Sequence, residues 1–363
     1  MTKLITSFYD PAKTYEDNFN HGPYADTSVA PYVNQGEPQF EAFGHKLYAP
    51  FGIPAGPLLN SQFVKYAFER GFDVLSYKTQ RSVPFTVNEF PNILYVDVDG
   101  DLTHEKASKP LLGQTSTTRP VEEFSITNSF GMPSRGPDYW VEDMQKALSY
   151  QGKGQLMIMC VVGTIQEGFT KEDYFRDFAD TAELAVKGGA TVIEVNLSCP
   201  NVANEGILCY SETAVMSICR QVKERIGNIP LLIKVGDYAP EQQELLEQIV
   251  KDVSPYIAGI SSINTIPAPI VNEEGNQALP GPNRLKSGVC GASIKWAGLD
   301  MSRRLKAIRE KLDLDFKIIG VGGVMSVADY HEYRQAGADI VQSATGAMWN
   351  PSLAAEIKAS RKL

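Results

Sequence analysis

Residues 191–201 read TVIEVNLSCPN, and this stretch indicates both a fold class and a kind of chemistry. The run 191–195 is rich in β-branched residues, which is typical of a buried strand. Four polar side chains gather where that strand ends: Asn196, Ser198, Cys199 and Asn201. Amide groups both donate and accept hydrogen bonds, and a thiol can take up a proton. The stretch therefore predicts a recognition site with an acid–base group at the carboxyl end of a strand.

Short apolar runs of the same kind recur along the chain, each followed by a helical pattern. We expect strands at 49–55, 73–78, 156–162, 191–197, 230–235, 257–264, 316–322 and 339–344. Apolar residues spaced three and four apart predict helices at 63–70, 174–186, 214–226, 242–253, 301–312, 327–336 and 353–358. Eight such units predict an α/β fold of the (β/α)8 TIM barrel type. An open doubly wound sheet is the alternative, although no GxGxxG follows the first strand.

Three segments lie outside this repeat. Residues 1–48 are rich in polar, aromatic and proline residues, and we expect them to form an N-terminal arm packed on a single barrel domain, 49–363. Residues 79–155 form a long excursion after the second strand, and within it 94–103 resembles a small hairpin turning at Asp99-Gly100. Residues 267–287 form a second excursion after the sixth strand. Both excursions should lie on the top face of the barrel and cover a site there.

Composition excludes several classes of protein. The net charge of −9 argues against a nucleic-acid or anionic-membrane surface. No run of 18 apolar residues occurs, and the first ten residues do not resemble a signal peptide. The five cysteines have no CxxC spacing, which favours reduced thiols over disulfides or a metal site. These features predict a cytoplasmic protein that binds no metal.

The ends of the predicted strands carry the candidate functional residues, since a barrel collects its chemistry there. Lys78 and Lys234 end two apolar runs, and a buried lysine needs an anionic partner. Four asparagines, at 128, 196, 201 and 264, together suit a polar ring, although each alone is also a common turn former. The glycines at 320–323 and the stretch 344–346 follow strands seven and eight, where barrels frequently bind phosphate.

Cys199 is the candidate acid–base residue. A cysteine nucleophile normally has a histidine partner. None of the four histidines, at 21, 45, 104 and 331, falls at a predicted strand end. The thiol is therefore better suited to accept a proton than to attack a substrate. A free cysteine that simply packs in the core is the alternative interpretation.

These motifs resemble the dihydroorotate dehydrogenase family of FMN-dependent barrels. The matching stretches are 55–56, 78–79, 128–133, 196–201, 234, 264–265, 288–292, 320–323 and 344–345. Cysteine at 199 is similar to class 1 enzymes, whereas class 2 enzymes carry serine there and an N-terminal membrane helix. The stretch 128–133 with Asp138-Tyr139-Trp140 is nearest to the homodimeric class 1A. The stretch 88–95 lacks an arginine that the class 1A pattern has.

The resemblance implies roles for individual residues. Cys199 would remove a C5 proton while a hydride passes from C6 of dihydroorotate to flavin N5. The implied substrate-binding residues are Lys78, Asn128, Gly131, Met132, Asn196, Asn201, Asn264 and Thr265. The implied FMN-binding residues are Ala55, Gly56, Lys78, Thr79, Asn196, Lys234, Gly291, Gly322, Gly323, Ala344 and Thr345. The implied assembly is a homodimer with a small dihydropyrimidine as substrate.

Two alternatives remain open from the sequence. A related flavin oxidoreductase acting on another dihydropyrimidine, such as dihydrouracil, would use the same residues. A barrel that binds FMN or a pyrimidine as a sensor would need the binding residues but not Cys199. The sequence does not decide between fumarate, NAD through a partner protein and oxygen as electron acceptor.

Overall fold

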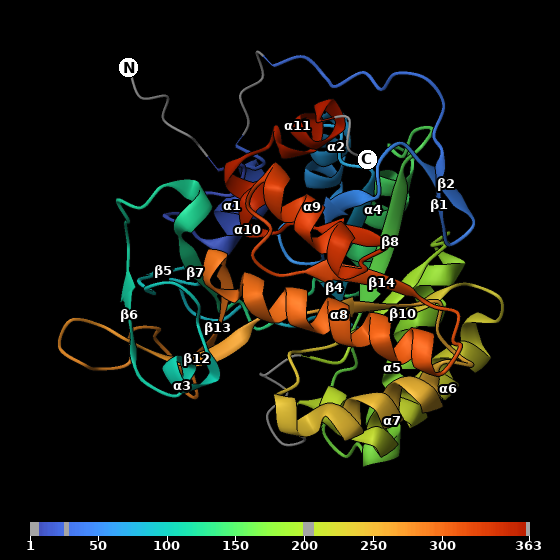
Figure 1. Ribbon diagram of the computed structural model, residues 1–363. Helices are drawn as coiled ribbons and strands as arrows, with labels where there is room; N and C mark the ends of the chain where they lie inside the picture. The colour runs from blue at the N-terminus through green and yellow to red at the C-terminus, as the bar shows by residue number, and fades with distance from the viewer. Residues whose placement is uncertain (1–6, 25–28, 199–206, 361–363) are drawn as a thin grey trace.

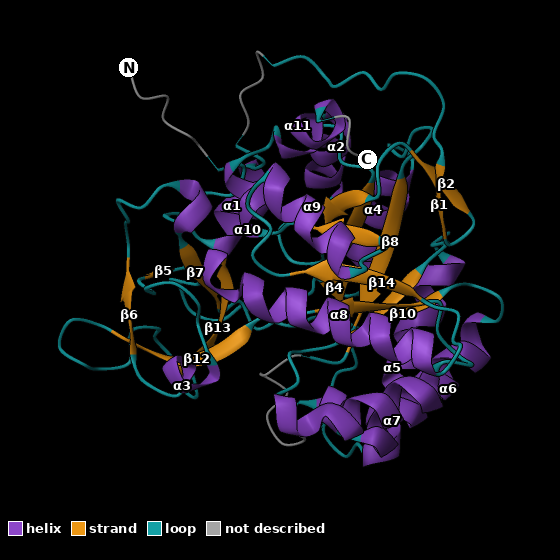
Figure 2. Ribbon diagram, in the orientation of Figure 1, coloured by secondary structure: helices purple, strands orange, loops and turns teal. Residues whose placement is uncertain are grey.

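The computed structural model describes residues 7–24, 29–198 and 207–360. Its centre is a closed barrel of eight parallel strands, surrounded by helices (Figures 1 and 2). In chain order these strands are β3 (Phe51–Ile53), β4 (Val74–Gln80), β8 (Leu156–Val161), β9 (Ile193–Asn196), β10 (Leu231–Lys234), β11 (Gly259–Ser262), β14 (Lys317–Val321) and β15 (Ile340–Gln342). All eight predicted strands are present, and the pairing of β15 with β3 closes the ring. The open-sheet alternative is therefore wrong.

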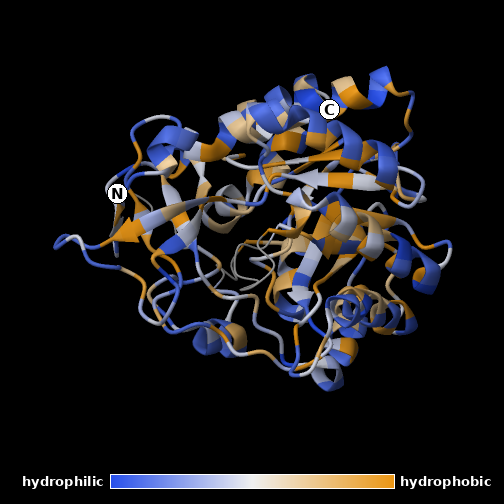
Figure 3. Cartoon of the chain, turned by 90° about the horizontal axis from the view of Figure 1, so that it is seen from below, coloured by the Kyte–Doolittle hydropathy of each residue, from blue (hydrophilic) through white to orange (hydrophobic). Residues whose placement is uncertain are grey.

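Helices follow the strands, and all seven predicted helices are present, together with two that the periodicity did not predict, at Pro137–Leu148 and Thr345–Trp349. They are α2 (Ser61–Glu69), α4 (Pro137–Leu148), α5 (Lys171–Lys187), α6 (Glu212–Ile226), α7 (Gln243–Val253), α8 (Lys295–Lys311), α9 (Val327–Ala336), α10 (Thr345–Trp349) and α11 (Leu353–Ala359). Helices α5 and α9 each begin with a capping box, at Thr170 and Ser326. Seen from below, apolar residues fill the strands while hydrophilic residues lie on the outer surfaces of the helices (Figure 3).

The inside of the barrel changes from apolar at the bottom to polar at the top. Side chains two residues apart on a strand point to the same side. Val74, Leu156, Val192, Leu232 and Ile340 pack together in one cluster near the amino ends of the strands. Two or four residues further along the same strands lie the buried polar side chains of Ser76, Cys160, Glu194, Lys234 and Gln342. The polar layer therefore lies next to the carboxyl ends of the strands.

The N-terminal arm contacts both ends of the barrel. Its hairpin of β1 (Phe40–Ala42) and β2 (His45–Leu47) packs Ala42 and Leu47 into the apolar cluster at the bottom. At the other end, α1 (Tyr15–His21) follows a segment tied to α10, where the Phe8 N–H donates to the Met348 carbonyl at 3.1 Å. These contacts agree with an arm packed on the barrel, although the domain boundary at residue 48 stays a prediction.

The two excursions together form a second, smaller closed sheet, seen at the left of Figure 1. Its strands are β5 (Tyr95–Val96), β6 (Leu111–Gln114), β7 (Ser125–Asn128), β12 (Ile266–Val271) and β13 (Lys286–Gly291). Strands β7 and β13 pair antiparallel, and β6 pairs parallel with β12, so each excursion is completed by the other.

The predicted hairpin over residues 94–103 is wrong. Tyr95 and Val96 pair with Gln114 and Gly113 on β6, and not with residues just beyond Asp99-Gly100. The chain does turn at Gly100, where φ is +62°, but it then enters α3 (His104–Ala107). Strand β5 pairs with β6 and β7, and β7 in turn pairs with β13 of the distant second excursion. A local sequence pattern does not predict pairings of this kind.

A buried ion pair joins three parts of the fold. The Lys358 Nζ of α11 lies 2.8 Å from a carboxylate oxygen of Asp73, and the two side chains are 6% and 0% exposed. The Ala49 N–H also donates to Asp73, at 2.7 Å, and Lys358 donates to Asn34 of the arm, at 2.7 Å. Burial raises the pKa of Asp73 to about 6, and the Lys358 ammonium opposes that rise.

We expect the substitution Lys358→Met to destabilise the protein by about 3–5 kcal/mol, because it leaves the Asp73 carboxylate buried without its cation. The double variant with Asp73→Asn should recover part of the loss. The control Lys109→Met removes an exposed pair with Glu105 and should change little. Urea denaturation followed by circular dichroism measures all three variants. Equal stability of Lys358→Met and the wild type would contradict the role given to this pair.

Candidate functional site

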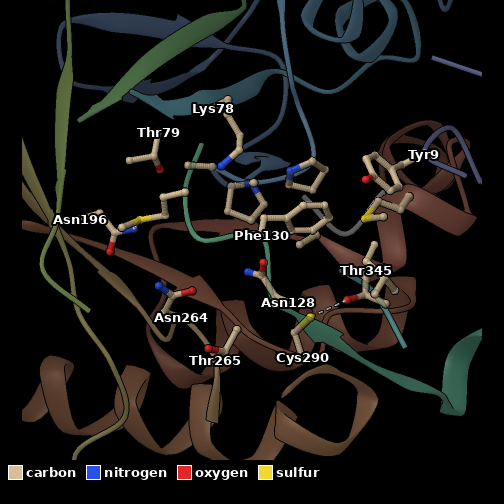
Figure 4. Close-up of a pocket in the computed structure, with 18 of the residues that line it drawn as sticks. Tyr9, Lys78, Thr79, Asn128, Phe130, Asn196, Asn264, Thr265, Cys290 and Thr345 are labelled. Carbon is tan, nitrogen blue, oxygen red and sulfur yellow. Dashed lines mark hydrogen bonds between the residues drawn. The ribbon is translucent and has the colours of Figure 1, made fainter. Parts of the chain in front are cut away.

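The main cavity lies at the carboxyl ends of the barrel strands, between the barrel and the smaller sheet (Figure 4). It holds about 1180 Å³ of empty space, counting its open mouth. The structure brings together in its lining most of the predicted site residues: Ala55, Gly56, Lys78, Thr79, Asn128, Gly131, Met132, Asn196, Lys234, Asn264, Thr265, Ala344 and Thr345.

Three predicted glycines lie beside the cavity without lining it. A Cβ at Gly291 would come within 2.6 Å of the Phe124 carbonyl oxygen, and one at Gly323 within 2.6 Å of the Lys295 nitrogen. Gly322, at φ +122°, packs against Ile263. Each glycine thus allows close backbone packing around the site. Cys199 and Asn201 lie outside the described residues.

Two buried lysines reach the cavity from β4 and β10. Lys78 and Lys234 are 5% and 6% exposed, as the interpretation of their strand-end positions predicts. The Lys234 Nζ donates to the Ser261 hydroxyl at 3.4 Å. Burial lowers the pKa of Lys234, and the nearby Glu194 carboxyl raises it. The site therefore holds two cationic side chains in a setting that favours an anionic or electron-rich ligand.

The asparagine side chains hold the start of the segment that leads to Cys199. Ser198 donates to the Asn196 Oδ1 through its N–H at 3.2 Å and through its hydroxyl at 3.3 Å. The Asn264 Nδ2 donates to the Ser198 hydroxyl at 2.8 Å. Ser198 was not predicted as a site residue, yet it links the two amides. Asn196 and Asn264 both line the cavity, so these hydrogen bonds fix Ser198, the last described residue of this segment, close to it.

The loop after β7 has an unusual backbone at the cavity. Gly131 and Met132 both have positive φ, +78° and +53°, and a methionine in that region carries strain. The Arg81 Nε donates to the Met132 carbonyl at 2.9 Å, and its Nη1 donates to the Gly163 carbonyl at 3.1 Å. Arg81 is buried, so it holds this loop against the barrel. The loop is thereby shaped before any ligand binds.

Sequence reasoning missed several residues of the lining. Tyr9 and Tyr15 of the N-terminal arm line the cavity and pack edge-on against Phe130, with ring centroids 5.7 Å and 5.9 Å away. No local pattern marked them, because the arm has no strand–helix repeat. Glu194 also lines the cavity, and its place two residues before Asn196 on one strand was a usable signal. Cys290 lines it as well and accepts a hydrogen bond from Thr345, at 3.6 Å (Figure 4).

Comparison of the chain with known proteins identifies the family that it resembles. Residues 115–360 match the family model described as dihydroorotate dehydrogenase. The chain is 37% identical over 357 residues to a dihydroorotate dehydrogenase of Dictyostelium discoideum, an alignment that covers 95% of each protein.

More distant relatives differ in the electron acceptor that their names give. The chain is 29% identical to the catalytic subunit of dihydroorotate dehydrogenase B (NAD(+)) of Petrotoga mobilis, over 64% of this chain and 70% of the relative. It is 26% identical to dihydroorotate dehydrogenase A (fumarate) of Lactobacillus delbrueckii subsp. bulgaricus, over 61% of this chain and 66% of the relative.

Arg284 ties the second excursion to the loops around the cavity. Its side chain is 6% exposed, and its guanidinium donates to the carbonyls of Glu89, Pro91 and Ser129 at 2.7, 3.0 and 3.1 Å. Two of these carbonyls belong to the stretch 88–95, which departs from the class 1A pattern. The arginine therefore takes part in shaping this stretch.

We expect Arg284→Met to lower stability by about 3 kcal/mol, because several buried carbonyls lose their donor. Limited proteolysis should then cut first within 267–287. The matched control Lys286→Met changes an exposed lysine two residues away on β13 and should leave both readouts unchanged. Thermal unfolding and mapping of the first cleavage site test this. A first cut elsewhere, at wild-type stability, would show that Arg284 does not hold the excursion.

Proposed function

The chain belongs to the dihydroorotate dehydrogenase family, and on that premise we propose that it oxidises dihydroorotate to orotate with FMN as cofactor. One observation carries the proposal: two buried lysines, three amides and a strained backbone loop meet around a single cavity at the carboxyl rim of the barrel. The reaction removes a hydride and a proton from neighbouring carbons. A site for it must hold a flat ring, an anionic substrate and a proton acceptor.

The cavity has the features that FMN requires. Its lining mixes apolar side chains with a few polar ones, as is typical of pockets that hold ring-shaped ligands. A Cβ at Gly56, where φ is +145°, would meet no atom within 4 Å, so a ring can approach this backbone closely. Lys234 would hold the electron-rich edge of the ring, and Ala344 and Thr345 would contact its phosphate-bearing tail. When bound, FMN supplies a two-electron acceptor that takes the hydride.

The same cavity supplies groups for the substrate. Lys78, Asn128, Asn196, Asn264 and Thr265 all line it and offer donors and acceptors to a pyrimidine ring. We propose that the backbone N–H groups of residues 131 and 132 bind the substrate carboxylate. Arg81 supports this role by fixing the loop in its strained conformation. Asn201 would complete the set from beyond the described residues.

Cys199 is proposed as the general base that takes the C5 proton. The support for this role is indirect: its neighbour Ser198 is hydrogen-bonded to Asn196 and Asn264, two amides that line the cavity. Within the described residues no histidine lines the cavity, which is consistent with a thiol acting alone. An unperturbed thiol has a pKa near 8.5, so turnover should rise with pH until the thiol ionises.

The remaining properties also follow from the resemblance. We propose a class 1 enzyme nearest to class 1A, a homodimer and a cytoplasmic location. Cysteine at position 199 supports class 1. In the described part of the chain no helix is both long and apolar enough to cross a bilayer.

Sedimentation equilibrium of the FMN-loaded protein tests the homodimer.

The absorbance spectrum of the purified protein tests the proposed function directly. We expect a flavin spectrum that bleaches on anaerobic addition of dihydroorotate. Dihydrouracil lacks the carboxylate that the loop at residues 131–132 would bind, so it should bleach the flavin much more slowly. Faster bleaching by dihydrouracil would favour the alternative substrate. A colourless protein that takes up no FMN would contradict the function.

Replacing Cys199 tests the general base. We expect Cys199→Ala to slow anaerobic flavin reduction by roughly 10²–10⁴-fold, the usual cost of a lost general base. Cys219→Ala is the control, because that thiol is buried within α6, outside the cavity lining. Stopped-flow absorbance measures both rates, and the flavin spectrum checks that FMN remains bound. An unchanged rate in Cys199→Ala would remove the thiol from the mechanism.

A further inference from the structure

A buried carboxyl group that the proposed chemistry does not use lies in the polar layer of the barrel. Glu194, on β9, is 1% exposed and lines the cavity. Its Oε2 has no hydrogen-bond partner among the described residues. Burying a carboxyl group is costly unless another group compensates it. Its position at the cavity therefore calls for an explanation.

The strand register places Glu194 beside Lys234 and Cys160. On β9 and β10, Glu194 is level with Leu232, and Asn196 is level with Lys234. Glu194 is thus one diagonal step from Lys234 on the inside of the barrel. On the other side it is level with Cys160 of β8. The Cys160 sulfur in turn accepts a hydrogen bond from the Thr79 hydroxyl, at 3.3 Å.

Ser261 connects the lysine to the carboxyl group. Its hydroxyl accepts from the Lys234 Nζ at 3.4 Å, and its hydrogen bonding to Glu194 helps to lower the pKa of that carboxyl. The Ser261 hydroxyl therefore links Lys234 to Glu194, and these two side chains do not form a direct ion pair in the described structure.

Burial and the Lys234 ammonium act on the pKa of Glu194 in opposite directions. Burial raises the pKa of Glu194, and the Lys234 ammonium lowers it. Burial also raises the pKa of Cys160 well above its usual range, so that thiol stays neutral. Among the described residues, Glu194 and Cys160 are the two groups whose negative charge would raise the pKa of Lys234, and of these two the carboxyl group is the stronger acid.

We propose that Glu194 is a positioning residue that sets the reduction potential of the bound flavin, by neutralising Lys234 beneath the cavity. The inference rests on the proposed flavin chemistry. A lone ammonium at the edge of the ring would favour the electron-rich reduced cofactor strongly. A carboxylate beside that ammonium weakens the preference. The reduced cofactor can then pass its electrons on to the second substrate.

The substitution Glu194→Gln tests this role, since it keeps the shape of the side chain and removes its charge. We expect the potential of bound FMN to rise. At an effective dielectric of about 20, a unit charge within roughly 10 Å shifts the equilibrium by about tenfold. For a two-electron couple, tenfold corresponds to about 30 mV. Equilibration with a reference dye under anaerobic conditions measures the potential. An unchanged or lowered potential would overturn the inference.

Three further variants separate this role from a merely structural one. Cys160→Ser exchanges one neutral group for another beside the same carboxyl and should leave the potential unchanged. Ser261→Ala removes the connecting hydroxyl and should raise the potential less than Glu194→Gln does; it also replaces that test if Glu194→Gln does not fold. In a Lys234→Met background, Glu194→Gln should raise the potential less than it does in the wild type, because the carboxyl group has lost the ammonium that favours its ionised form.

The outcomes distinguish this inference from the proposed function. A wild type that takes up no FMN would overturn both. A wild type that binds FMN and is bleached by dihydroorotate, with a Glu194→Gln variant of the same potential, would overturn only the role of Glu194. If Cys160→Ser raised the potential of bound FMN as much as Glu194→Gln does, the shift would not come from the charge of Glu194, because Cys160→Ser changes no charge.

Discussion

The boundary between the apolar and polar layers inside the barrel is the constraint on which the site depends. Below it, side chains such as Val74, Leu156 and Leu232 fill the barrel with hydrocarbon. Above it, the same strands present polar groups that are nearly inaccessible to water. Buried polar groups must satisfy one another. The Gln342 Nε2, for example, donates to the Ser76 hydroxyl at 3.2 Å. The Gln342 Oε1 and the Glu194 Oε2 have no partner among the described residues, so this polar floor is only partly satisfied without a ligand.

Much of the barrel could be predicted because its information is local. A strand buried on both faces needs a continuous apolar run, so 230–235 and 316–322 were recognisable without any knowledge of their neighbours. Lys78, Asn196 and Lys234 could be predicted as site residues because they lie at the carboxyl ends of strands, and a parallel barrel brings all these ends to one rim.

The rest depended on contacts between distant parts of the chain. The predicted partner of β5 was wrong. Its actual partners, β6 and β7, belong to a sheet that also contains strands of the second excursion, so the pairing depends on residues far away in the sequence. Tyr9 reaches the cavity only because the arm docks on α10. Glu194 belongs to the stretch 191–201, but the sequence does not indicate which residues surround it. The strand register, which sets it level with Cys160 and one step from Lys234, supplies those neighbours.

The closure of both sheets has a consequence for how the chain acquires its shape. The barrel closes by pairing β3 with β15, almost three hundred residues apart, and the smaller sheet closes by pairing β6 with β12. Contacts between distant residues form late, because the chain between them must first lose its freedom. During synthesis on the ribosome, a chain that ends before β15 lacks the strand that closes the barrel, together with the lining residues Ala344, Thr345 and Met348 that follow it. Such a chain therefore has no complete cavity in which to hold a cofactor.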